Sequence, residues 1–309
     1  MKPVAYFCPC VQGAVPLDHW SAFKCKALPM PLGWIIGITK GMDDPDHSGG
    51  KITATRILDC PRKVLIEDFV RPRADDPNFG LVFDPRRFNS ARFGSVVHAD
   101  IAANTPGGAY KEVRFPLPGQ EPVSLDFGEG VVQTISGAVD YLAPDTICIE
   151  DYKTHSETAH KFKWNRKSAE PELRAQFSIY KILVERCIEG AQVTQMRVWH
   201  GAQTSAKHPA PSWFQLEVPP LALEDIGAMR PFGALQNVRS IIKMLQFGLT
   251  GIAAIGAPPD STEWYRELDA IVGQLPMVGE TMFNGEKCPT YCGAAQPYCY
   301  RVAGRAEIL

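Results

Sequence analysis

The sequence predicts an α/β protein with a central mixed sheet flanked by helices. Two segments rich in Val, Ile and Tyr, residues 132–142 and 146–152, are typical of strands and surround a turn at Ala143-Pro144-Asp145-Thr146. A helix is predicted over 171–189, because apolar residues recur there at helical spacing. Further strands are predicted at 196–201 and 212–218, and further helices at 225–249 and 261–275.

Length and charge limit the function classes. A chain of 309 residues is long enough for one sizeable core, or for a core with a small added module. The formal charge of −2 gives no global field for polyanions, so contact with nucleic acid needs a local basic patch. The most apolar run, 241–257, contains Lys243 and Gln246 and favours a buried helix over a membrane span. We expect a soluble, cytoplasmic protein, in the host cytoplasm if it is viral.

Residues 1–50 are predicted to be an irregular N-terminal extension. Cys8, Cys10, His19 and Cys25 suggest a small zinc site, but their spacing matches no common zinc pattern. An extension with free thiols is the favoured interpretation. Residues 51–220 then form the core, and residues 221–309 add helices and a cysteine cluster that complete the same domain.

A helix is predicted at 92–101, before the two central strands. Gly94 allows close approach to a neighbouring element, and His98 follows one helical turn later. A lone histidine on a helix is more often a satisfied core residue than a ligand. Beside an acidic hairpin, however, this imidazole can supply a metal ligand.

The hairpin carries the predicted chemistry. Pairing around the turn puts Asp140 opposite Ile149 and diagonal to Asp151, about 7–8 Å apart at Cα. Lys153 projects on the same side as Asp151. Two such carboxylates favour Mg²⁺ or Mn²⁺, and the lysine can orient or deprotonate a water. The alternative is a surface hairpin with solvated charges, which the short pattern alone favours.

Residues 160–167 are predicted to be a basic loop. Cations there alternate with aromatic residues, an arrangement that can hold single-stranded nucleic acid, although a solvated basic loop is an equal alternative. In the following helix, Gln176 and Tyr180 are neighbours on one face and can bond to the lysine, a phosphate or a metal-bound water, or simply pack. The predicted DNA-binding residues are Lys161, Lys163, Trp164, Arg166 and Lys167.

Nine cysteines is an odd number that favours metal or cluster ligation over disulfides. Cys148 and Cys187 lie in apolar patterns and are predicted to be core residues. Three cysteines fall within the tail, and Cys60 is the natural fourth ligand. Four thiolates suit zinc or an iron–sulfur cluster. The tail cysteines are Cys288, Cys292 and Cys299.

Taken together, the chain resembles the PD-(D/E)XK nuclease superfamily, and within it the RecB-like exonucleases with an iron–sulfur cluster, including the CRISPR-associated ones. The likeness covers about residues 53–300. The motifs occur in the family's order: Gly94-x-x-x-His98, Asp140, Asp151-x-Lys153, Gln176-x-x-x-Tyr180, and Cys60-Pro61 with the cysteine-containing tail.

The resemblance implies a restriction-endonuclease-like core with an iron–sulfur clasp joining its N- and C-terminal parts. His98, Asp140, Asp151 and the carbonyl of Tyr152 would bind Mg²⁺ or Mn²⁺, and Lys153 would activate the attacking water. Gln176 and Tyr180 would position Lys153 and the DNA. A structural 4Fe–4S cluster would be held by Cys60, Cys288, Cys292 and Cys299. The tail spacings are each one residue longer than usual in this group, which keeps zinc as an alternative.

The expected function is a DNA exonuclease acting on single strands or duplex ends, in recombination, repair, or phage or CRISPR DNA processing. The first alternative is a nuclease fold that serves as a DNA-binding or viral structural or packaging component without turnover. The second is a structure-specific endonuclease or an RNA-acting enzyme. DNA is the expected partner, no membrane is, and possible partner proteins are open.

Overall fold

The computed structural model of the chain shows two compact units. Unit 1 comprises Met1–Lys51, Arg56–Phe88 and Arg230–Leu309, and unit 2 comprises Ile52–Thr55 and Asn89–Met229. The structure describes the backbone of residues 3–8, 13–16, 67 and 81–83, and with side chains residues 52–66, 68–69, 94, 96–100, 103–104, 109–145, 147–202, 212–259 and 261–276.

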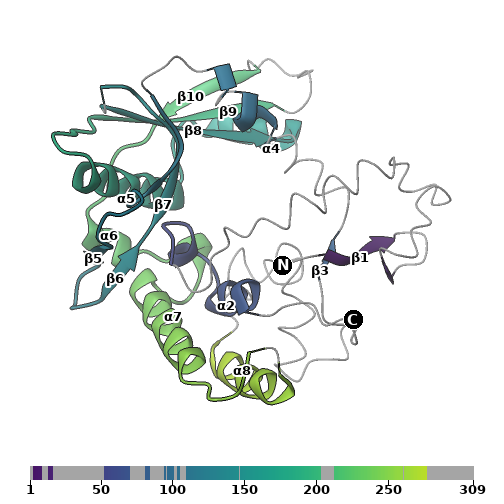
Figure 1. Cartoon of the computed structure of the whole chain (residues 1–309). Coiled ribbons are helices and arrows are strands. Elements are labelled where there is room, and N and C mark those ends of the chain that lie inside the picture. Colours follow the sequence, from purple (N-terminus) through teal and green to yellow (C-terminus); the bar gives the residue numbers. More distant parts are fainter. Residues whose placement is uncertain are drawn as a thin grey trace. The chain divides into compact units, whose positions relative to one another are not determined.

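Unit 2 is built on a five-stranded mixed sheet with strand order β10-β9-β8-β7-β4. Strands β8 and β9 run parallel, and the other neighbours are antiparallel (Figure 1). The predicted α/β class with a central mixed sheet is therefore confirmed. The strands are β4 (Tyr110–Phe115), β7 (Gly137–Leu142), β8 (Cys148–His155), β9 (Gln195–Ala202) and β10 (Trp213–Glu217).

Helices flank this sheet. Helix α5 (Pro171–Cys187) has proline in its first turn, where the missing N–H costs nothing, and it packs on β7. The close approach depends on Gly137, because a Cβ there would lie 2.7 Å from Cε1 of Tyr180. Helix α4 (Glu157–Arg166) covers β8 and β9. A short helix, α6 (Leu223–Ala228), follows β10.

The segment 157–166 was predicted to be a loop from residue 160 onward, and that prediction is wrong. Its charges complement the helix dipole, with Glu157 in the first turn and Lys163 and Arg166 in the last. Lys167 then ends the helix in the left-handed conformation, with φ of 55°. Although basic and aromatic residues alternate in this segment, their helix propensities are ordinary, so the segment can form a helix.

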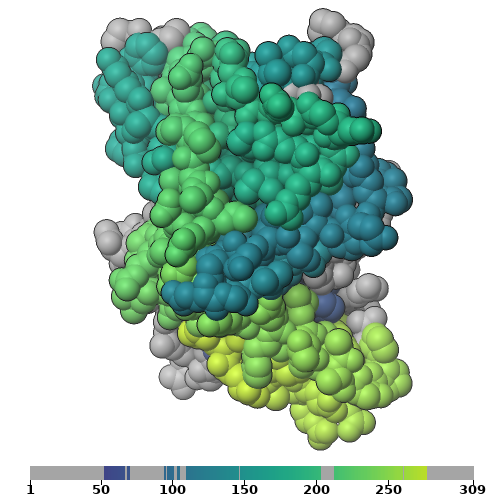
Figure 2. Space-filling model, turned by 90° about the vertical axis from the view of Figure 1, so that its left-hand side faces the viewer, coloured from purple at the N-terminus to yellow at the C-terminus, as the bar shows by residue number. Residues whose placement is uncertain are grey.

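The predicted strand 132–142 is two strands. Residues Val132–Ile135 form β6, which pairs with β5 (Val123–Asp126) in a separate hairpin. Ser136 interrupts the run, because its backbone N–H and carbonyl bond to Ile52 and Ala54 instead. Figure 2 shows the β5–β6 hairpin in blue against the teal-green residues of α5, where Arg186 donates to the Ser124 carbonyl at 2.9 Å.

Unit 1 contains a helical group and a small sheet. The predicted helix 225–249 is wrong in extent: α6 ends at Ala228, a 3-10 turn with proline at its start follows, and α7 begins only after the Asn237 cap. The predicted irregular extension contains two short strands, which join β3 in the order β2-β1-β3. Among the described residues, the elements of unit 1 are β1 (Pro3–Cys8), β2 (Gly13–Pro16), η3 (Arg56–Leu58), α2 (Pro61–Phe69), β3 (Leu81–Phe83), η4 (Pro231–Gly233), α7 (Val238–Ala253) and α8 (Thr262–Gln274).

Helices α2, α7 and α8 pack closely. A Cβ at Gly248 of α7 would lie 2.3 Å from Cδ1 of Leu65 on α2, so only glycine permits this approach. The buried Arg62 donates to the carbonyls of Gly273, at 2.8 Å, and Leu275 at the end of α8. No helix among the described residues has both the length and the apolar character to cross a membrane.

Candidate metal centre

The β7–β8 hairpin brings the two predicted acidic ligands together. Leu142 pairs with Ile149, and the same register carried past the last paired residues sets Asp140 opposite Asp151. The prediction that Asp140 lies opposite Ile149 is therefore wrong by two positions. Because side chains alternate with a period of two, that shift still leaves both carboxylates on one face.

The shift comes from the turn. Oδ1 of Asp145 accepts a hydrogen bond from the backbone N–H of Ile147 at 3.3 Å. The Ala143 N–H bonds to the Cys148 carbonyl at 2.9 Å, so the connection is longer than the tight turn that the sequence suggested.

His98 reaches this hairpin from a helical segment, in which residues 94, 96–100, 103 and 104 are described. A Cβ on Gly94 would lie 3.3 Å from Oγ1 of Thr154, so glycine lets the helix approach β8 as the sequence indicated. Nε2 of His98 lies 2.8 Å from the Tyr152 carbonyl oxygen and 3.7 Å from Oδ2 of Asp140. Three of the four predicted metal-binding groups, His98, Asp140 and the Tyr152 carbonyl, thus lie together.

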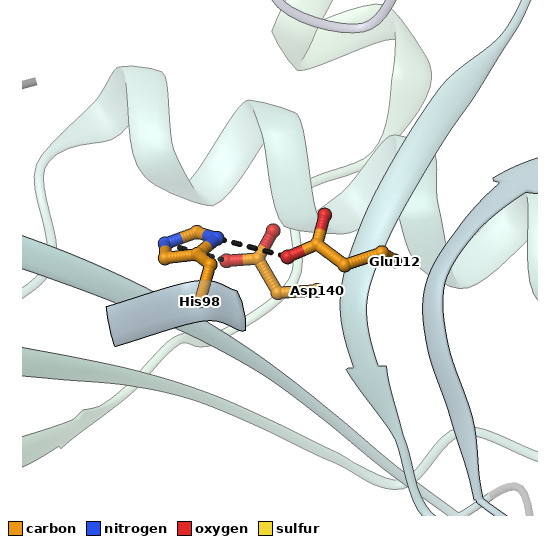
Figure 3. A group of neighbouring side chains, drawn as sticks. All are labelled: His98, Glu112 and Asp140. Carbon is orange, nitrogen blue, oxygen red and sulfur yellow. Dashed lines mark hydrogen bonds and ion pairs between the residues drawn. The ribbon is translucent and has the colours of Figure 1, made fainter. Parts of the chain in front are cut away.

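Glu112 is the residue that the sequence analysis missed. It lies on β4 directly across from Asp140, between the pairs of Lys111 with Tyr141 and Val113 with Val139. Its Oε1 atom is 3.0 Å from Nδ1 of His98 (Figure 3). One ligand atom each from His98, Glu112 and Asp140 fit within 4.8 Å of one another.

The backbone of Glu112 has φ of 49°, a left-handed conformation that is unfavourable for a residue with a Cβ. Residues held in such conformations are common at functional sites, where the surroundings hold them in place. Nothing in the alternating sequence of β4 distinguishes this glutamate from a solvated edge residue. Only the register of three strands reveals its position.

The pKa values of the cluster show its electrostatic strain. The hydrogen bond that His98 donates to Glu112 outweighs burial and, with the charge of Asp140, raises the pKa of His98 to about 9. Burial and then the charge of Asp151 raise the pKa of Asp140 to about 7. Oδ2 of Asp140 also accepts the Tyr152 N–H at 3.0 Å. The site thus holds crowded oxygen atoms around a positively charged imidazole.

Asp151 and Lys153 form an ion pair next to this cluster. Asp151 is 2% exposed, and its Oδ2 lies 2.7 Å from Nζ of Lys153. That oxygen accepts no hydrogen bond of regular geometry from the described residues. Burial opposes the charge of Lys153, but Asp151 and Asp140 together raise its pKa. Lys153 is therefore a cation here, suited to offset negative charge.

Gln176 and Tyr180 lie side by side on α5, as predicted. Nε2 of Gln176 donates to the Tyr180 hydroxyl at 2.7 Å, and both side chains are buried. Burial and the negative charge of Asp151 raise the pKa of the Tyr180 hydroxyl. The pair therefore borders the Asp151–Lys153 ion pair from the helix side.

The predicted DNA-binding residues lie on α4 and divide into two groups. Lys163 forms an ion pair with Glu170, and the half-buried Trp164 packs edge-on against Phe214 with ring centroids 5.2 Å apart. Lys161, Arg166 and Lys167 are exposed. Phe162, which is 61% exposed, is the aromatic residue of α4 that faces solvent.

The predicted cluster cysteines are mostly outside the described residues. Cys288, Cys292 and Cys299 lie there, as do His19, Cys10 and Cys25, and Cys8 is described only as backbone. Cys60 is buried immediately before Pro61, and its carbonyl accepts the N–H of Val64 at 3.1 Å. Cys148 and Cys187 are buried, as predicted for core residues.

The donor set fits a hard divalent cation. An imidazole nitrogen, a backbone carbonyl and carboxylate oxygens are the ligands that Mn²⁺ and Mg²⁺ accept. The raised pKa of Asp140, which is caused by burial and then by the charge of Asp151, indicates crowded negative charge that a cation would relieve. His98, Glu112, Asp140 and the Tyr152 carbonyl could hold such a cation, whereas Asp151 is paired with Lys153.

Comparisons with known proteins add little. No family model matches the chain, and no curated protein matches it. A solved structure described as the crystal structure of SSO0001 is 14% identical, with 74% of this chain and 96% of that chain covered and a TM-score of 0.37. Support for a function therefore comes from the geometry of the site and not from kinship.

Proposed function

We propose that the chain is a metal-dependent deoxyribonuclease, an exonuclease that hydrolyses phosphodiester bonds of single-stranded DNA or duplex ends. The observation that carries this proposal is the convergence of His98, Asp140 and the Tyr152 carbonyl beside the Asp151–Lys153 pair. Recombination, repair, and phage or CRISPR DNA processing are the settings in which such an activity acts. The proposal includes the PD-(D/E)XK, RecB-like family and its restriction-endonuclease-like core.

The metal ligands would be Asp140, Asp151, the Tyr152 carbonyl and, once Nε2 has lost its proton, His98. When bound, Mg²⁺ or Mn²⁺ supplies a Lewis acid that polarises a phosphate oxygen and acidifies a bound water. The chain's own contribution is a rigid arrangement, because a sheet register fixes Asp140 and Asp151 and the close helix contact at Gly94 fixes His98.

Lys153 would orient the attacking water and offset the charge that develops on the phosphate. Its raised pKa favours this electrostatic role over proton abstraction. Gln176 and Tyr180 border the same ion pair and would limit the positions open to Lys153 and the DNA. The neighbouring α4 presents Lys161, Arg166 and Lys167 for the phosphate backbone, and Phe162 for stacking on an unpaired base.

A 4Fe–4S cluster at Cys60, Cys288, Cys292 and Cys299 belongs to the same proposal, with zinc as the alternative. Cys60 lies where a proline begins α2, so a thiolate there would be anchored to a helix start. Metal analysis together with the visible absorbance of the purified protein separates iron from zinc.

The test is cleavage of end-labelled oligonucleotides by the full chain with Mn²⁺. We expect mononucleotide products, no cleavage with EDTA, and a loss of roughly 10²–10⁴-fold in Lys153→Ala. Lys243→Ala, which changes an exposed lysine of α7, should cleave like the wild type. Undiminished cleavage by Lys153→Ala, or none by the wild type, would refute the proposal. Internal cuts in end-blocked substrates would change the proposed activity from exonuclease to endonuclease.

A further inference from the structure

A pair of histidines continues the row of catalytic side chains but has no part in the mechanism above. On β8, His155 lies two residues beyond Lys153 and four beyond Asp151, so all three point to the same face. On the neighbouring β9, His200 pairs in register with Lys153. The pair therefore lies at the end of the row that begins with the metal ligands.

The two rings are joined by a hydrogen bond. Nε2 of His155 lies 2.7 Å from Nδ1 of His200, with the ring centroids 4.9 Å apart. His200 is 2% exposed and packs against Phe214, whose ring centroid is 5.1 Å away. Nε2 of His200 is shielded from solvent and has no hydrogen-bond partner among the described residues. His155, in contrast, is only half-buried.

Both rings are neutral at neutral pH. Burial first, and then the charges of Lys163, His160 and Lys153, lower the pKa of His155 to about 4. Burial and the neighbouring His155 lower the pKa of His200 to about 3. A neutral imidazole has one N–H and one bare nitrogen, so a single proton lies between the two rings.

The buried nitrogen decides which ring donates. If His155 donated, Nε2 of His200 would carry a buried N–H with no acceptor, and such orphaned donors are rare in folded proteins. If His200 donates through Nδ1, its Nε2 is a bare nitrogen, which is the less costly state. Nε2 of His155 is then the acceptor, and Nδ1 of His155 carries its proton. No described residue accepts that proton.

We propose that His155 is a substrate-binding residue that donates its Nδ1–H to a DNA phosphate, and that His200 is the positioning residue that fixes this tautomer. Two residues along a strand span about 7 Å, so His155 would meet a phosphate next to the one that Lys153 serves. A neutral hydrogen-bond donor fits this place, because the positive charges of Lys153 and Lys163 nearby disfavour a second cation at His155. This inference rests on the proposed nuclease function.

Paired variants of each histidine separate this role from simple packing. In His200→Asn, an amide nitrogen takes the place of Nδ1 and keeps the donor, while His200→Phe keeps the ring volume and loses the donor. His155→Phe removes the proposed phosphate contact. The readouts are binding of a fluorescent single-stranded oligonucleotide with Ca²⁺, binding of Mn²⁺ alone, and thermal unfolding.

We expect His155→Phe and His200→Phe to weaken oligonucleotide binding by roughly 10- to 100-fold, with unchanged Mn²⁺ affinity. His200→Asn should bind DNA within a few fold of the wild type although it is less stable. A purely structural pair predicts the reverse order, with Asn more harmful than Phe. That order, or wild-type binding by His155→Phe, would overturn the inference.

The ¹⁵N shifts of the histidine rings test the tautomer independently of DNA. We expect protonated Nδ1 and bare Nε2 in both residues, with signals assigned from the variants. The opposite tautomer of His155 would overturn the positioning role. If the wild type bound Mn²⁺ and cleaved DNA while His155→Phe matched it, only this inference would fail. If the wild type bound neither Mn²⁺ nor DNA, the proposed function would fail as well.

Discussion

The helix ends of unit 1 and the candidate metal centre of unit 2 differ in how well their polar groups are paired. At the helix ends of unit 1, several polar groups are matched: Arg62 donates to two carbonyls at the end of α8, and Asn237 and Ser261 accept the N–H groups of Ser240 and Trp264 at 2.9 and 3.1 Å. Such matches stabilise helix ends.

At the metal centre the polar groups conflict. Asp140 and Asp151 repel each other across the hairpin, and Glu112 has a left-handed backbone. Burial of like charges costs free energy unless a cation neutralises them. The difference teaches that the helix ends of unit 1 satisfy their own polar groups, whereas the cluster in unit 2 keeps a conflict between charges, which the proposed metal ion would relieve.

The largest expected effect is that of Asp140→Asn. Loss of this carboxylate should abolish Mn²⁺ binding and lower cleavage by roughly 10³-fold or more, because a metal ligand is removed. Without metal at pH 8 the folded Asp140, with pKa raised to about 7, is mostly ionised and destabilising. The variant should therefore gain about 1–2 kcal/mol of unfolding free energy in EDTA. Calorimetry and cleavage assays measure both effects, and a less stable variant would contradict the contrast between the units.

The next effect is expected in unit 1. Arg62→Leu leaves the buried carbonyls of Gly273 and Leu275 without their donor, which should cost about 2–3 kcal/mol of unfolding free energy. Chemical denaturation measures this loss. Mn²⁺ affinity and cleavage below the unfolding transition should be unchanged. The exposed Arg266, which pairs with Glu263 at 3.1 Å, gives a control, because Arg266→Leu should be nearly neutral.

A third prediction concerns Glu112. If its carboxylate holds the ring of His98, both Glu112→Gln and Glu112→Gly should weaken Mn²⁺ binding, by roughly 10- to 100-fold for glycine and less for glutamine, which keeps an acceptor. Glycine also relieves the left-handed backbone, so Glu112→Gly should be at least as stable as Glu112→Gln. Titration calorimetry and thermal unfolding test the two properties separately. Equal Mn²⁺ affinity in all three proteins would remove Glu112 from the site.

Much of this arrangement could be predicted from the sequence, because it depends on the periodicity of side chains along strands and helices and on the order of the motifs in the chain. Alternation on β8 put Asp151 and Lys153 on one face, and the spacing of four on α5 made Gln176 and Tyr180 neighbours. The hairpin register differs from the predicted one by two residues. This shift leaves the two carboxylates on the same face, so the prediction that they lie on one face still holds.

The rest depended on information that is not local. Glu112 enters the site through the pairing of β4 with β7, which no spacing within β4 encodes. The loop predicted at 160–167 is a helix up to Arg166, because basic and aromatic residues have sufficient helix propensity, which their alternation does not reveal. The break at Ser136 arises from pairing with residues near position 53, a contact of high sequence separation.

The smallest expected effect is on the pH dependence of stability. His155 and His200 have folded pKa values lowered to about 4 and about 3, below the unfolded value near 6.5. As the pH falls below 6.5, the unfolded chain takes up protons that the folded chain does not bind, so each of the two histidines lowers stability by about 1 kcal/mol per pH unit. His98, with its pKa raised to about 9, loses stability only as the pH rises from 6.5 through 9, so it adds no slope in this window. Asp140, with its folded pKa raised to about 7, adds an opposite slope in this window, and it does so in the wild type and the variant alike. His200→Phe removes one of the two histidines and should reduce the fall in stability between pH 6.5 and 4.5 by about 1 kcal/mol per pH unit in denaturation experiments. An unchanged slope would mean that the buried pair accepts protons in the folded state, and the tautomer argument would fail with it.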